Sequence, residues 1–600
     1  MSTHDKHTEK EFEYEIVKHL VSANWIEGTS EGYDKELSLY PDDLISYIKA
    51  TQSQAYEKME KREGAKTDSV LCQHVAKEMD KHSALHYLRN DVKYIGSKFK
   101  LCQFKPELHN MDTQEKYDAN ILRVVRQVYY STKNQNSIDL VLFLNGIPIA
   151  TFELKTDFTQ NVHDAITQYK YDRPPKGEPL LEFKRRALVH FAVSTDEVYM
   201  STRLAGPNTF FLPFNRGQED GSAGNPPNPH GYATSYLWED VLQRDSILNI
   251  IARYIHLEVQ DKEDHQGKRY KKETLIFPRY HQLDVVRRLL SDTKVKGAGH
   301  HYLVQHSAGS GKSNSIAWLA HQLSSLHHDN EDSAFDSIIV ITDRTVLDDQ
   351  LQETIASFDH KDGVVVGISR TGTNESKSTQ LADALERGAK IIITTIQTFP
   401  FVLEAIQQRT SLKGRKYAII ADEAHSSQSG SSAKQLREVL TAEQIEEGVE
   451  ISAEDIIVAS LESRTAGSSL SFYAFTATPK AKTLEMFGVL PNPGEPPSET
   501  NTPHAFHLYT MKQAIQEGFI LDVLQGYTTY KVYYKLEHSN MHKDEEVESK
   551  RAKVKIAKWL STHPFNIAQK IDIIINHFMR DVVHLLEGQA KAMVVTSSRK

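Results

Sequence analysis

A glycine-bearing loop between an apolar strand and a helical pattern constrains the fold of this chain more than any other feature. The loop has the sequence His306-Ser307-Ala308-Gly309-Ser310-Gly311-Lys312-Ser313, and it follows the apolar run Tyr302-Leu303-Val304. Apolar residues at helical spacing come next, from Ile316 to Ala320. Strand, glycine loop and helix in this order are typical of a P-loop, in which backbone N–H groups and a helix N-terminus bind phosphate. The sequence therefore predicts a nucleotide site here.

Five residues of this loop are candidate nucleotide ligands: Gly309, Ser310, Gly311, Lys312 and Ser313. The glycines let the backbone curl around phosphate oxygens, which a Cβ would obstruct. The ammonium of Lys312 would reach the β- and γ-phosphates of ATP, and the hydroxyl of Ser313 would hold Mg²⁺. One position departs from the usual eight-residue pattern, because His306 stands where the first glycine is expected. The alternative is a glycine turn before an ordinary helix.

Four more apolar runs predict buried strands that alternate with helices: 338–341, 391–393, 417–421 and 472–475. Such an alternation predicts a parallel sheet with its ligands at the carboxyl edge. The first two runs end in hydroxyl-rich segments that begin at Thr342 and Thr394. These hydroxyls would bind nucleic-acid phosphates, or they would cap the helices that follow.

The last two runs end in acidic and hydroxyl residues that suit nucleotide chemistry, Asp422-Glu423-Ala424-His425 and Thr476-Ala477-Thr478. Asp422 would hold the water shell of Mg²⁺, and Glu423 would polarise the attacking water. His425 would link the nucleotide state to a neighbouring element, and Thr476 is a further candidate at the nucleotide. Upstream, Gln282 is a candidate reader of adenine, because a side-chain amide both donates and accepts hydrogen bonds; an ordinary N-cap region is the alternative.

A second constellation lies in the N-terminal third, where two β-rich runs, 137–144 and 147–155, flank Asn145-Gly146 and predict a hairpin. A three-residue loop would set Asp139 directly opposite Glu153 on one face. A two-residue loop would turn the two carboxylates to opposite faces unless a bulge intervened. Lys155 shares the face of Glu153, because it lies two residues further along the strand.

Two carboxylates and a lysine on one strand face are typical of a metal-dependent nuclease. The oxygens of Asp139 and Glu153 suit Mg²⁺, which would activate water and neutralise charge at the scissile phosphate. Lys155 would orient the water or stabilise the developing negative charge. The alternative is a strand edge with solvated charges, although unpaired charge inside apolar strands is costly. Downstream, Gln168, Tyr169 and Tyr171 lie on an expected helix.

The order Asp139, Glu153, Lys155 resembles the PD-(D/E)xK nuclease family, and Gln168, Tyr169 and Tyr171 resemble the glutamine–tyrosine helix of RecB-like nucleases without its usual spacing. The P-loop, Asp-Glu-Ala-His and Thr-Ala-Thr motifs resemble a DEAH-type superfamily 2 helicase motor. With these motifs and three further segments, the chain resembles the restriction (R) subunit of a type I restriction-modification enzyme. The further segments are 124–127, 190–193 and 211–215. The resemblance implies a cytoplasmic complex with methylation (M) and specificity (S) subunits. It also implies ATP-driven pumping of double-stranded DNA and Mg²⁺-dependent cutting away from the recognition site.

We expect an α/β chain in three parts: an endonuclease domain at 1–260, a first RecA-like motor domain at 261–490, and a linker with the start of a second RecA-like domain at 491–600. Residues 261–272 are charged and are expected to form a linker. An amphipathic helix is expected at 571–586. A strand is expected at 592–598, and we expect the second RecA-like domain to be incomplete at Lys600.

Composition narrows the functional classes. The net charge is −9, so DNA contact has to come from a local basic surface rather than from the whole chain. Cys72 and Cys102 are the only cysteines, which excludes a disulfide framework or a cysteine zinc cluster and suits a reducing cytosol. No apolar run approaches the ~20 residues of a membrane span. Two alternatives to an R subunit remain: an ATP-dependent helicase or remodeller with a catalytically inactive nuclease-fold DNA-binding module, and a scaffold that uses nucleotide as a conformational switch.

Overall fold

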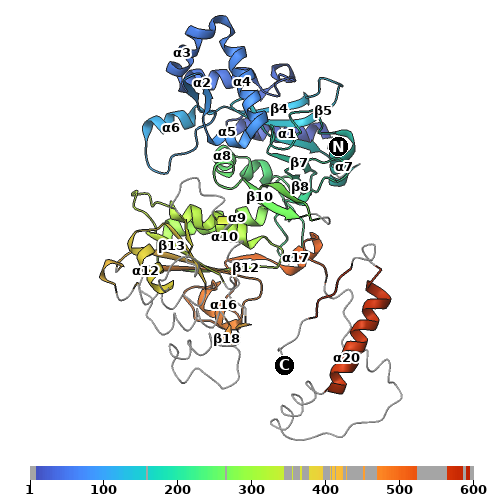
Figure 1. Cartoon of the computed structure of the whole chain (residues 1–600), viewed down its shortest axis with the longest axis vertical. Coiled ribbons are helices and arrows are strands. Elements are labelled where there is room, and N and C mark those ends of the chain that lie inside the picture. The colour runs from blue at the N-terminus through green and yellow to red at the C-terminus, as the bar shows by residue number, and fades with distance from the viewer. Residues whose placement is uncertain are drawn as a thin grey trace, which may run out of the picture. The chain divides into compact units, whose positions relative to one another are not determined.

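The computed structural model describes residues 9–156, 160–263, 267–342, 354–355, 365–367, 377–395, 406, 409–412, 414–422, 427–428, 451–452, 469–522, 564–584 and 590–594. The chain divides into two compact units, Met1–Leu521 and Asp522–Lys600, and each is described by itself (Figure 1). No described helix has the length and apolar character needed to cross a membrane.

The N-terminal part of the first unit is built on a mixed seven-stranded sheet in the order β1-β4-β5-β6-β7-β8-β9 (Figure 1). Its strands are β1 Ile26–Gly28, β4 Leu122–Tyr129, β5 Ser137–Leu144, β6 Ile147–Leu154, β7 Val189–Val193, β8 Val198–Ser201 and β9 Leu212–Pro213. The β1/β4 and β6/β7 pairs are parallel and the others are antiparallel. The two central strands β5 and β6 are buried almost throughout, which explains their continuous apolar sequence.

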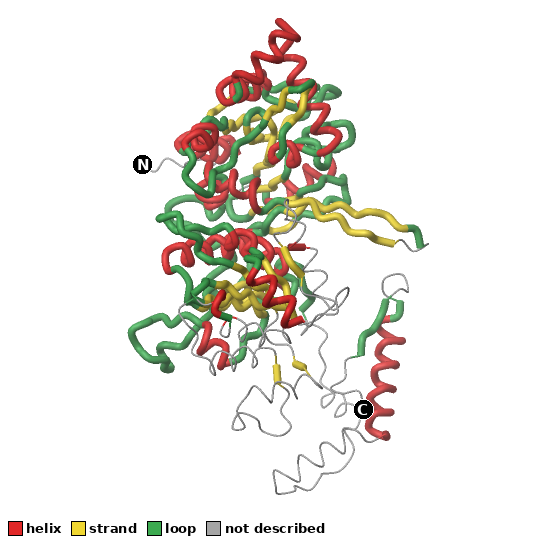
Figure 2. The backbone as a smooth tube through the Cα atoms, turned by 60° about the vertical axis from the view of Figure 1, so that its left-hand side comes forward, coloured by secondary structure: helices red, strands yellow, loops and turns green. Residues whose placement is uncertain are grey.

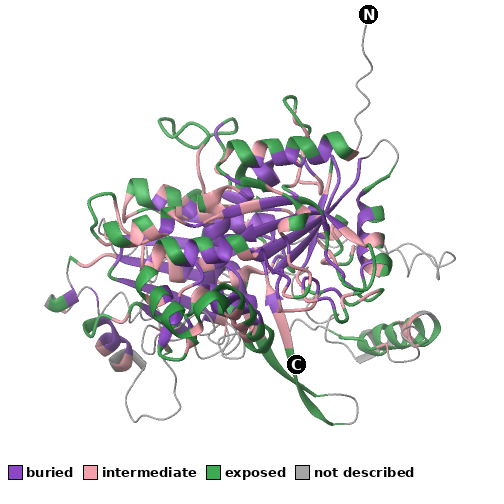
Figure 3. Cartoon of the chain, turned by 90° about the horizontal axis from the view of Figure 1, so that it is seen from above, coloured by how far each residue is buried: buried purple, intermediate pink, exposed green. Residues whose placement is uncertain are grey.

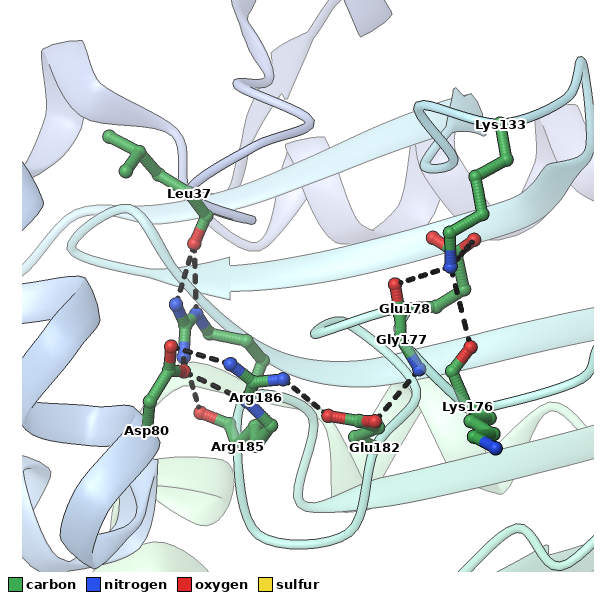
Figure 4. A network of polar contacts seen from close by, with 9 residues as sticks. All are labelled: Leu37, Asp80, Lys133, Lys176, Gly177, Glu178, Glu182, Arg185 and Arg186. Atoms are coloured by element: carbon green, nitrogen blue, oxygen red, sulfur yellow. Dashed lines mark hydrogen bonds and ion pairs between the residues drawn. The ribbon is translucent and has the colours of Figure 1, made fainter.

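Helices and a polar network surround this sheet. The helices are α1 Glu9–Ser22, α2 Pro41–Thr51, α3 Ser53–Glu63, α4 Thr67–His82, α5 Ala84–Arg89, α6 Met111–Asp118, α7 Val162–Thr167 and α8 Arg244–Arg253. Figure 4 shows how the fully buried Arg186 anchors α4, because its guanidinium bonds Asp80 at 2.7 Å and the Leu37 carbonyl at 2.7 and 3.0 Å. A small antiparallel pair, β2 Val92–Tyr94 with β3 Ser97–Phe99, lies outside the main sheet.

The second sheet of this unit carries the P-loop and has the order β14-β15-β13-β16-β19-β12-β20. Its strands are β12 His301–His306, β13 Ser337–Thr342, β14 Val365–Gly367, β15 Ile391–Thr395, β16 Tyr417–Asp422, β19 Leu470–Thr476 and β20 His507–Tyr509. Every pair is parallel, which confirms the expected parallel α/β class. Helices accompany the strands: α9 Tyr280–Lys296, α10 Lys312–Ser324, α12 Lys377–Glu386, α16 Ala481–Phe487 and α17 Met511–Gln516. Strand interiors are buried in both sheets (Figure 3).

The expectation of a linker at 261–272 is wrong. Most of these residues belong to an antiparallel ribbon of β10 His256–Glu263 and β11 Arg269–Ile276, with eight residue pairs in register. Figure 2 shows it as a two-stranded ribbon that projects from the first unit. Charge density suggested a linker, but period-2 side-chain alternation allows a strand to carry charge on both faces once it leaves the core.

The motor sheet also continues past residue 490, where its end was expected, because β20 pairs with β12. In the second unit, α20 Pro564–His577 and a π-helical turn at Phe578–Val582 form the amphipathic helix, which begins earlier than expected. Residues 592–594 of the expected strand are described without strand structure, and residues 595–600 lie outside the described part. A short pair, β17 Ser427–Gln428 with β18 Ile451–Ser452, completes the described strands.

Candidate nuclease and nucleotide sites

A bulge in the β5–β6 hairpin decides where its carboxylates lie. Asn145 and Gly146 have φ values of 49° and 79°, as a two-residue turn requires, and Leu144 pairs with Ile147. The register then shifts by one residue between Leu142 and Phe143, so that Leu140 pairs with Phe152. Asp139 therefore lies opposite Glu153. Of the two arrangements that allow a shared site, the structure has the bulge.

The two carboxylates are buried side by side. Asp139 is 7% exposed and Glu153 has no exposed surface. The Leu154 N–H donates to Asp139 Oδ2 at 2.8 Å, and Arg173 Nε donates to Glu153 Oε1 at 2.7 Å. Among the described residues, Glu153 Oε2 has no hydrogen-bond partner. Burial, followed by the charge of Asp139, raises the pKa of Glu153 well above its ordinary value, although Arg173 acts in the opposite direction.

Helix α1 and strand β4 add polar groups to which the sequence analysis assigned no role in this site. Gln127 has a left-handed φ of 48° and lies across from Asp139. Its amide donates to Glu13 Oε2 at 3.0 Å and to Asp139 Oδ1 at 3.4 Å. Burial and the charge of Asp139 raise the pKa of Glu13, an effect that its hydrogen bond to Gln127 opposes. One helical turn earlier, Glu9 accepts from Lys155 Nζ at 3.4 Å. The four-residue spacing of Glu9 and Glu13 on an amphipathic helix was the available signal.

The glutamine–tyrosine segment contributes one residue beneath the site. Tyr169 is fully buried, and its hydroxyl lies 2.8 Å from Thr151 Oγ1, which also contacts His190 Nδ1 at 2.8 Å. Burial, followed by the charge of Glu153, raises the pKa of Tyr169 well above its ordinary value. Tyr171 is 64% exposed, and Gln168 is half-buried in a π-helical turn.

The carboxylates of Asp139 and Glu153 suit a hard divalent cation by their chemistry, but they are only two in number. An unpartnered carboxylate oxygen on Glu153, next to a second buried carboxylate, is the type of atom that Mg²⁺ would complete. No group of three or more His, Cys, Asp or Glu side chains in the described ranges is arranged to hold a metal ion. Mg²⁺ often binds through only one or two carboxylates plus water and substrate phosphate, so Asp139 and Glu153 fit this ion.

The P-loop forms as the sequence predicts, at the end of β12 and before α10. Gly309 and Gly311 have φ values of 73° and 76°, and a Cβ on Gly311 would lie 2.5 Å from Gln282 Nε2. Lys312 is half-buried, and its Nζ lies 3.4 Å from the His306 carbonyl. Ser313 is exposed in the first turn of α10, and Ser310 is buried.

Residues of α9 fix the loop from one side. Gln282 Nε2 donates to the Gly311 carbonyl at 2.9 Å, and Gln282 Oε1 accepts from the Arg279 N–H at 2.9 Å. Arg279 donates to the Gly309 carbonyl at 3.0 Å and lies over the Phe519 ring at 4.1 Å. A cavity of about 490 Å³ is lined in part by Arg279, Gln282, Gly311 and Asn314. Gln282 therefore borders a cavity, its role as a reader of adenine stays a prediction, and Arg279 is a neighbour that sequence reasoning missed.

His306, which replaces the expected glycine, belongs to a buried relay. Its Nε2 lies 2.8 Å from His507 Nδ1, and His507 Nε2 lies 3.0 Å from Asp284 Oδ2. A carboxylate only accepts, so in neutral His507 the Nε2 donates to Asp284 and the Nδ1 accepts from His306. Burial, followed by the nearby His507, lowers the pKa of His306 well below its ordinary value. The relay joins β12, β20 and α9, and this explains why a large residue is tolerated at the entry of the loop.

The remaining nucleotide candidates lie at the same sheet edge where they are described. Thr476 ends β19 and pairs with Gln305 of β12, and Asp422 ends β16 and pairs with Phe475. One strand therefore separates Asp422 from the P-loop strand, and Thr476 lies on that strand. Glu423 and His425 lie outside the described residues.

Comparisons with known proteins cover both regions. Residues 6–209 match the family model of the type I restriction enzyme R protein N terminus, and residues 281–445 match that of the SWI2/SNF2 ATPase. The chain resembles the R subunits of type I restriction enzymes. It is 27% identical over 300 residues to the HindI endonuclease subunit of Haemophilus influenzae, covering 49% of this chain and 26% of that protein. It is 23% identical over 380 residues to the MjaVIIIP endonuclease subunit of Methanocaldococcus jannaschii, covering 58% and 33%.

These relatives are longer than this R-subunit-like chain. The matches cover between 26% and 43% of their length. Solved structures are more distant. A fragment of an HsdR subunit of a type I restriction enzyme from Vibrio vulnificus matches at 14% identity with a TM-score of 0.22, covering 61% of this chain and 53% of that one. The Sulfolobus solfataricus SWI2/SNF2 ATPase core in complex with dsDNA matches at 15% identity with a TM-score of 0.21, covering 34% of each.

Proposed function

We propose that this R-subunit-like chain uses ATP to translocate double-stranded DNA and cleaves it with a Mg²⁺-dependent site away from the recognition sequence. The observation that carries the proposal is the bulged hairpin that sets Asp139 beside Glu153, in the unit that also holds the P-loop. The M and S subunits that the resemblance to type I restriction enzymes implies would be its partners.

In the nuclease site, Asp139 and Glu153 would hold Mg²⁺, with Glu153 Oε2 as the free ligand atom. A bound divalent ion supplies an activated water and neutralises charge at the scissile phosphate. Lys155 is held by Glu9 within reach of this face, where its ammonium would stabilise the developing negative charge. Arg173 keeps one oxygen of Glu153 fixed, and the Leu154 N–H does the same for Asp139.

In the motor site, the backbone of Gly309, Ser310 and Gly311 would bind the phosphates, and Lys312 would neutralise the transferring phosphoryl group. Ser313 and Asp422 would bind the Mg²⁺ of the nucleotide. Glu423, His425 and Thr476 would polarise water and pass on the nucleotide state. Gln282 would contact the adenine at the cavity beside it.

The test is the change Asp139→Ala in the enzyme that contains this chain. Cutting of duplex DNA should be abolished while ATP hydrolysis persists, because Asp139 belongs to the hairpin and not to the P-loop. Asp112→Ala is the matched control, since Asp112 is exposed on α6 and, among the described residues, forms an ion pair with Lys116 alone. Undiminished cutting by the Asp139 variant would overturn the assignment.

A second candidate is an ATP-dependent helicase or remodeller whose nuclease-fold module binds DNA without cutting it. The Arg173–Glu153 ion pair favours it, because a buried cation already neutralises part of the charge that a metal would compensate. The same experiment separates the two candidates. DNA-stimulated ATP turnover without Mg²⁺-dependent cutting by the parent enzyme would establish the second.

A further inference from the structure

The β10–β11 ribbon carries two chemically different faces. Directly opposite residues in an antiparallel pair share a face, so even-numbered residues lie on one side and odd-numbered residues on the other. On the odd face the charges neutralise one another across the strands: Arg269 lies opposite Glu263 and forms an ion pair at 4.0 Å, and Lys271 lies opposite Asp261. Each cation that the structure describes on this face of the ribbon therefore lies opposite an anion.

The even face is different. Lys262 lies opposite Tyr270, and Gln260 lies opposite Lys272, and all four side chains are exposed. Neither lysine forms an ion pair with any residue that the structure describes. The two lysines are diagonal neighbours, at a backbone separation of about 7–8 Å, where like charges repel. Two adjacent cations that form no ion pair within the described part of the chain, beside an aromatic hydroxyl, form a surface that favours an anionic partner.

Folding alone does not account for so long a ribbon. Only its base, at residues such as His256 and Leu275, is buried, and from Val259 to Lys272 every described residue is exposed. A two-stranded ribbon without a core to cover is marginally stable in water. Its length, about 27 Å for eight residues at 3.4 Å each, is enough to reach beyond the body of the protein.

We propose that the even face of this ribbon, Gln260, Lys262, Tyr270 and Lys272, contacts the phosphate backbone of duplex DNA. The inference rests on the proposed motor function, since a motor on duplex DNA needs a local basic surface in a chain of net charge −9. A two-stranded ribbon fits the major groove, lysines bind phosphate without reading sequence, and a tyrosine hydroxyl donates to phosphate oxygens. The contact therefore positions the duplex and does not select its sequence.

The ribbon provides its own matched control. Lys262→Ala/Lys272→Ala and Arg269→Ala/Lys271→Ala each remove two positive charges from the same two strands, so a purely long-range charge effect would be equal in both. Binding of a fluorescent duplex of arbitrary sequence by the whole chain is measured by anisotropy over a salt series. The even-face variant should bind more weakly, and the slope of log K against log salt should fall by up to about 1.8, or 0.9 for each lost phosphate contact. The odd-face variant should behave as the parent.

Thermal unfolding of both double variants checks that the ribbon persists. Equal weakening by the two variants, or parental binding by the even-face variant, would overturn the proposal. Parental DNA binding together with lost assembly with another subunit would assign the surface to a protein partner instead, and would also overturn it. A parent chain that binds no duplex at any salt concentration would refute the proposed function itself, which keeps the two failures distinct.

Discussion

The two candidate sites of this chain would both act on phosphate groups, but they are built from different parts of the protein: backbone groups in one and buried carboxylates in the other. The P-loop is a local structure, in which the proposed phosphate ligands are mainly backbone N–H groups of consecutive residues after β12. The candidate nuclease site is assembled from α1, β4, β5, β6 and the segment after α7, and its proposed metal ligands are buried carboxylates held by cations and amides. A site built from consecutive residues depends on a few positions. A site assembled from several elements contains buried carboxylates, and neighbouring side chains have to neutralise their charge. Substitutions should therefore affect activity first in the motor, and stability as well as activity in the nuclease site.

The largest expected effect is on the motor. Lys312→Ala should lower ATP turnover by about 10³-fold or more, if the cation of Lys312 contributes as much as the lower end of the range for an arginine finger. Thermal stability should change little, because Lys312 is half-buried and its Nζ lies 3.4–3.5 Å from loop carbonyls. ATPase assays and thermal unfolding measure both effects, with the exposed Lys296→Ala as control. A large stability loss with intact turnover would reverse the proposed contrast between the sites.

In the candidate nuclease site, the counterpart of Lys312→Ala is Arg173→Gln, and its main expected effect is on stability. Arg173→Gln should destabilise the metal-free chain by about 3–5 kcal/mol, because Glu153 is left buried without its cation. Denaturant unfolding measures the loss, and added Mg²⁺ should restore more stability to this variant than to the parent. Arg269→Gln is the control, since its ion pair is exposed and should change stability by no more than about 0.5 kcal/mol. Equal losses of unfolding free energy from Arg173→Gln and Arg269→Gln would show that Glu153 does not need its buried cation for stability.

A third change tests whether the P-loop is local throughout. His306→Gly restores the usual glycine, yet it should destabilise the chain by about 1–3 kcal/mol, because it removes a buried ring and its hydrogen bond to His507. Nucleotide affinity should not improve. His300→Gly, at an exposed position just before β12, is the control for the backbone effect of glycine. Stabilisation by His306→Gly would mean that the hydrogen-bonded relay with His507 and Asp284 does not stabilise the fold.

The same contrast explains how much the sequence could predict. The P-loop, its strand and its helix were predictable because consecutive residues build them. The hairpin and both carboxylates were also predictable, but the bulge beside Phe143 was left open, since the Asn145-Gly146 turn fixes the loop and not the register beyond it. Arg173 could not be found from spacing, because it reaches Glu153 only after the chain has folded back.

Two other features escaped prediction for physical reasons. His306 departs from the P-loop pattern because β20, two hundred residues away in sequence, supplies His507 as its partner. The β10–β11 ribbon resembled a linker because apolar alternation, the usual strand signal, is absent where a strand leaves the core. Charged residues occupy both strands instead, and their pairing across the strands became visible only with the register.

The smallest expected effect is a pH dependence that belongs to the nuclease site. Burial and Asp139 raise the pKa of Glu153 above its ordinary value of about 4.5, so the proton is retained at higher pH than on a free carboxylate. A metal ion needs the ionised form, so protons and Mg²⁺ compete at Glu153. Metal affinity should therefore rise as pH increases through the raised pKa, by at most about tenfold per pH unit for one proton, and level off above it.

Calorimetric titration of the chain with Mn²⁺ over a pH series measures this dependence and the protons released on binding. Glu153→Gln should bind the ion weakly and without proton release, because its amide has no proton to lose in this range. Nucleotide binding at the P-loop should not follow the same pH profile, since the backbone groups that hold the phosphates do not titrate. A Mn²⁺ affinity that is flat with pH in the parent would mean that Glu153 is not a ligand, and the site would then have to bind its ion through Asp139 alone.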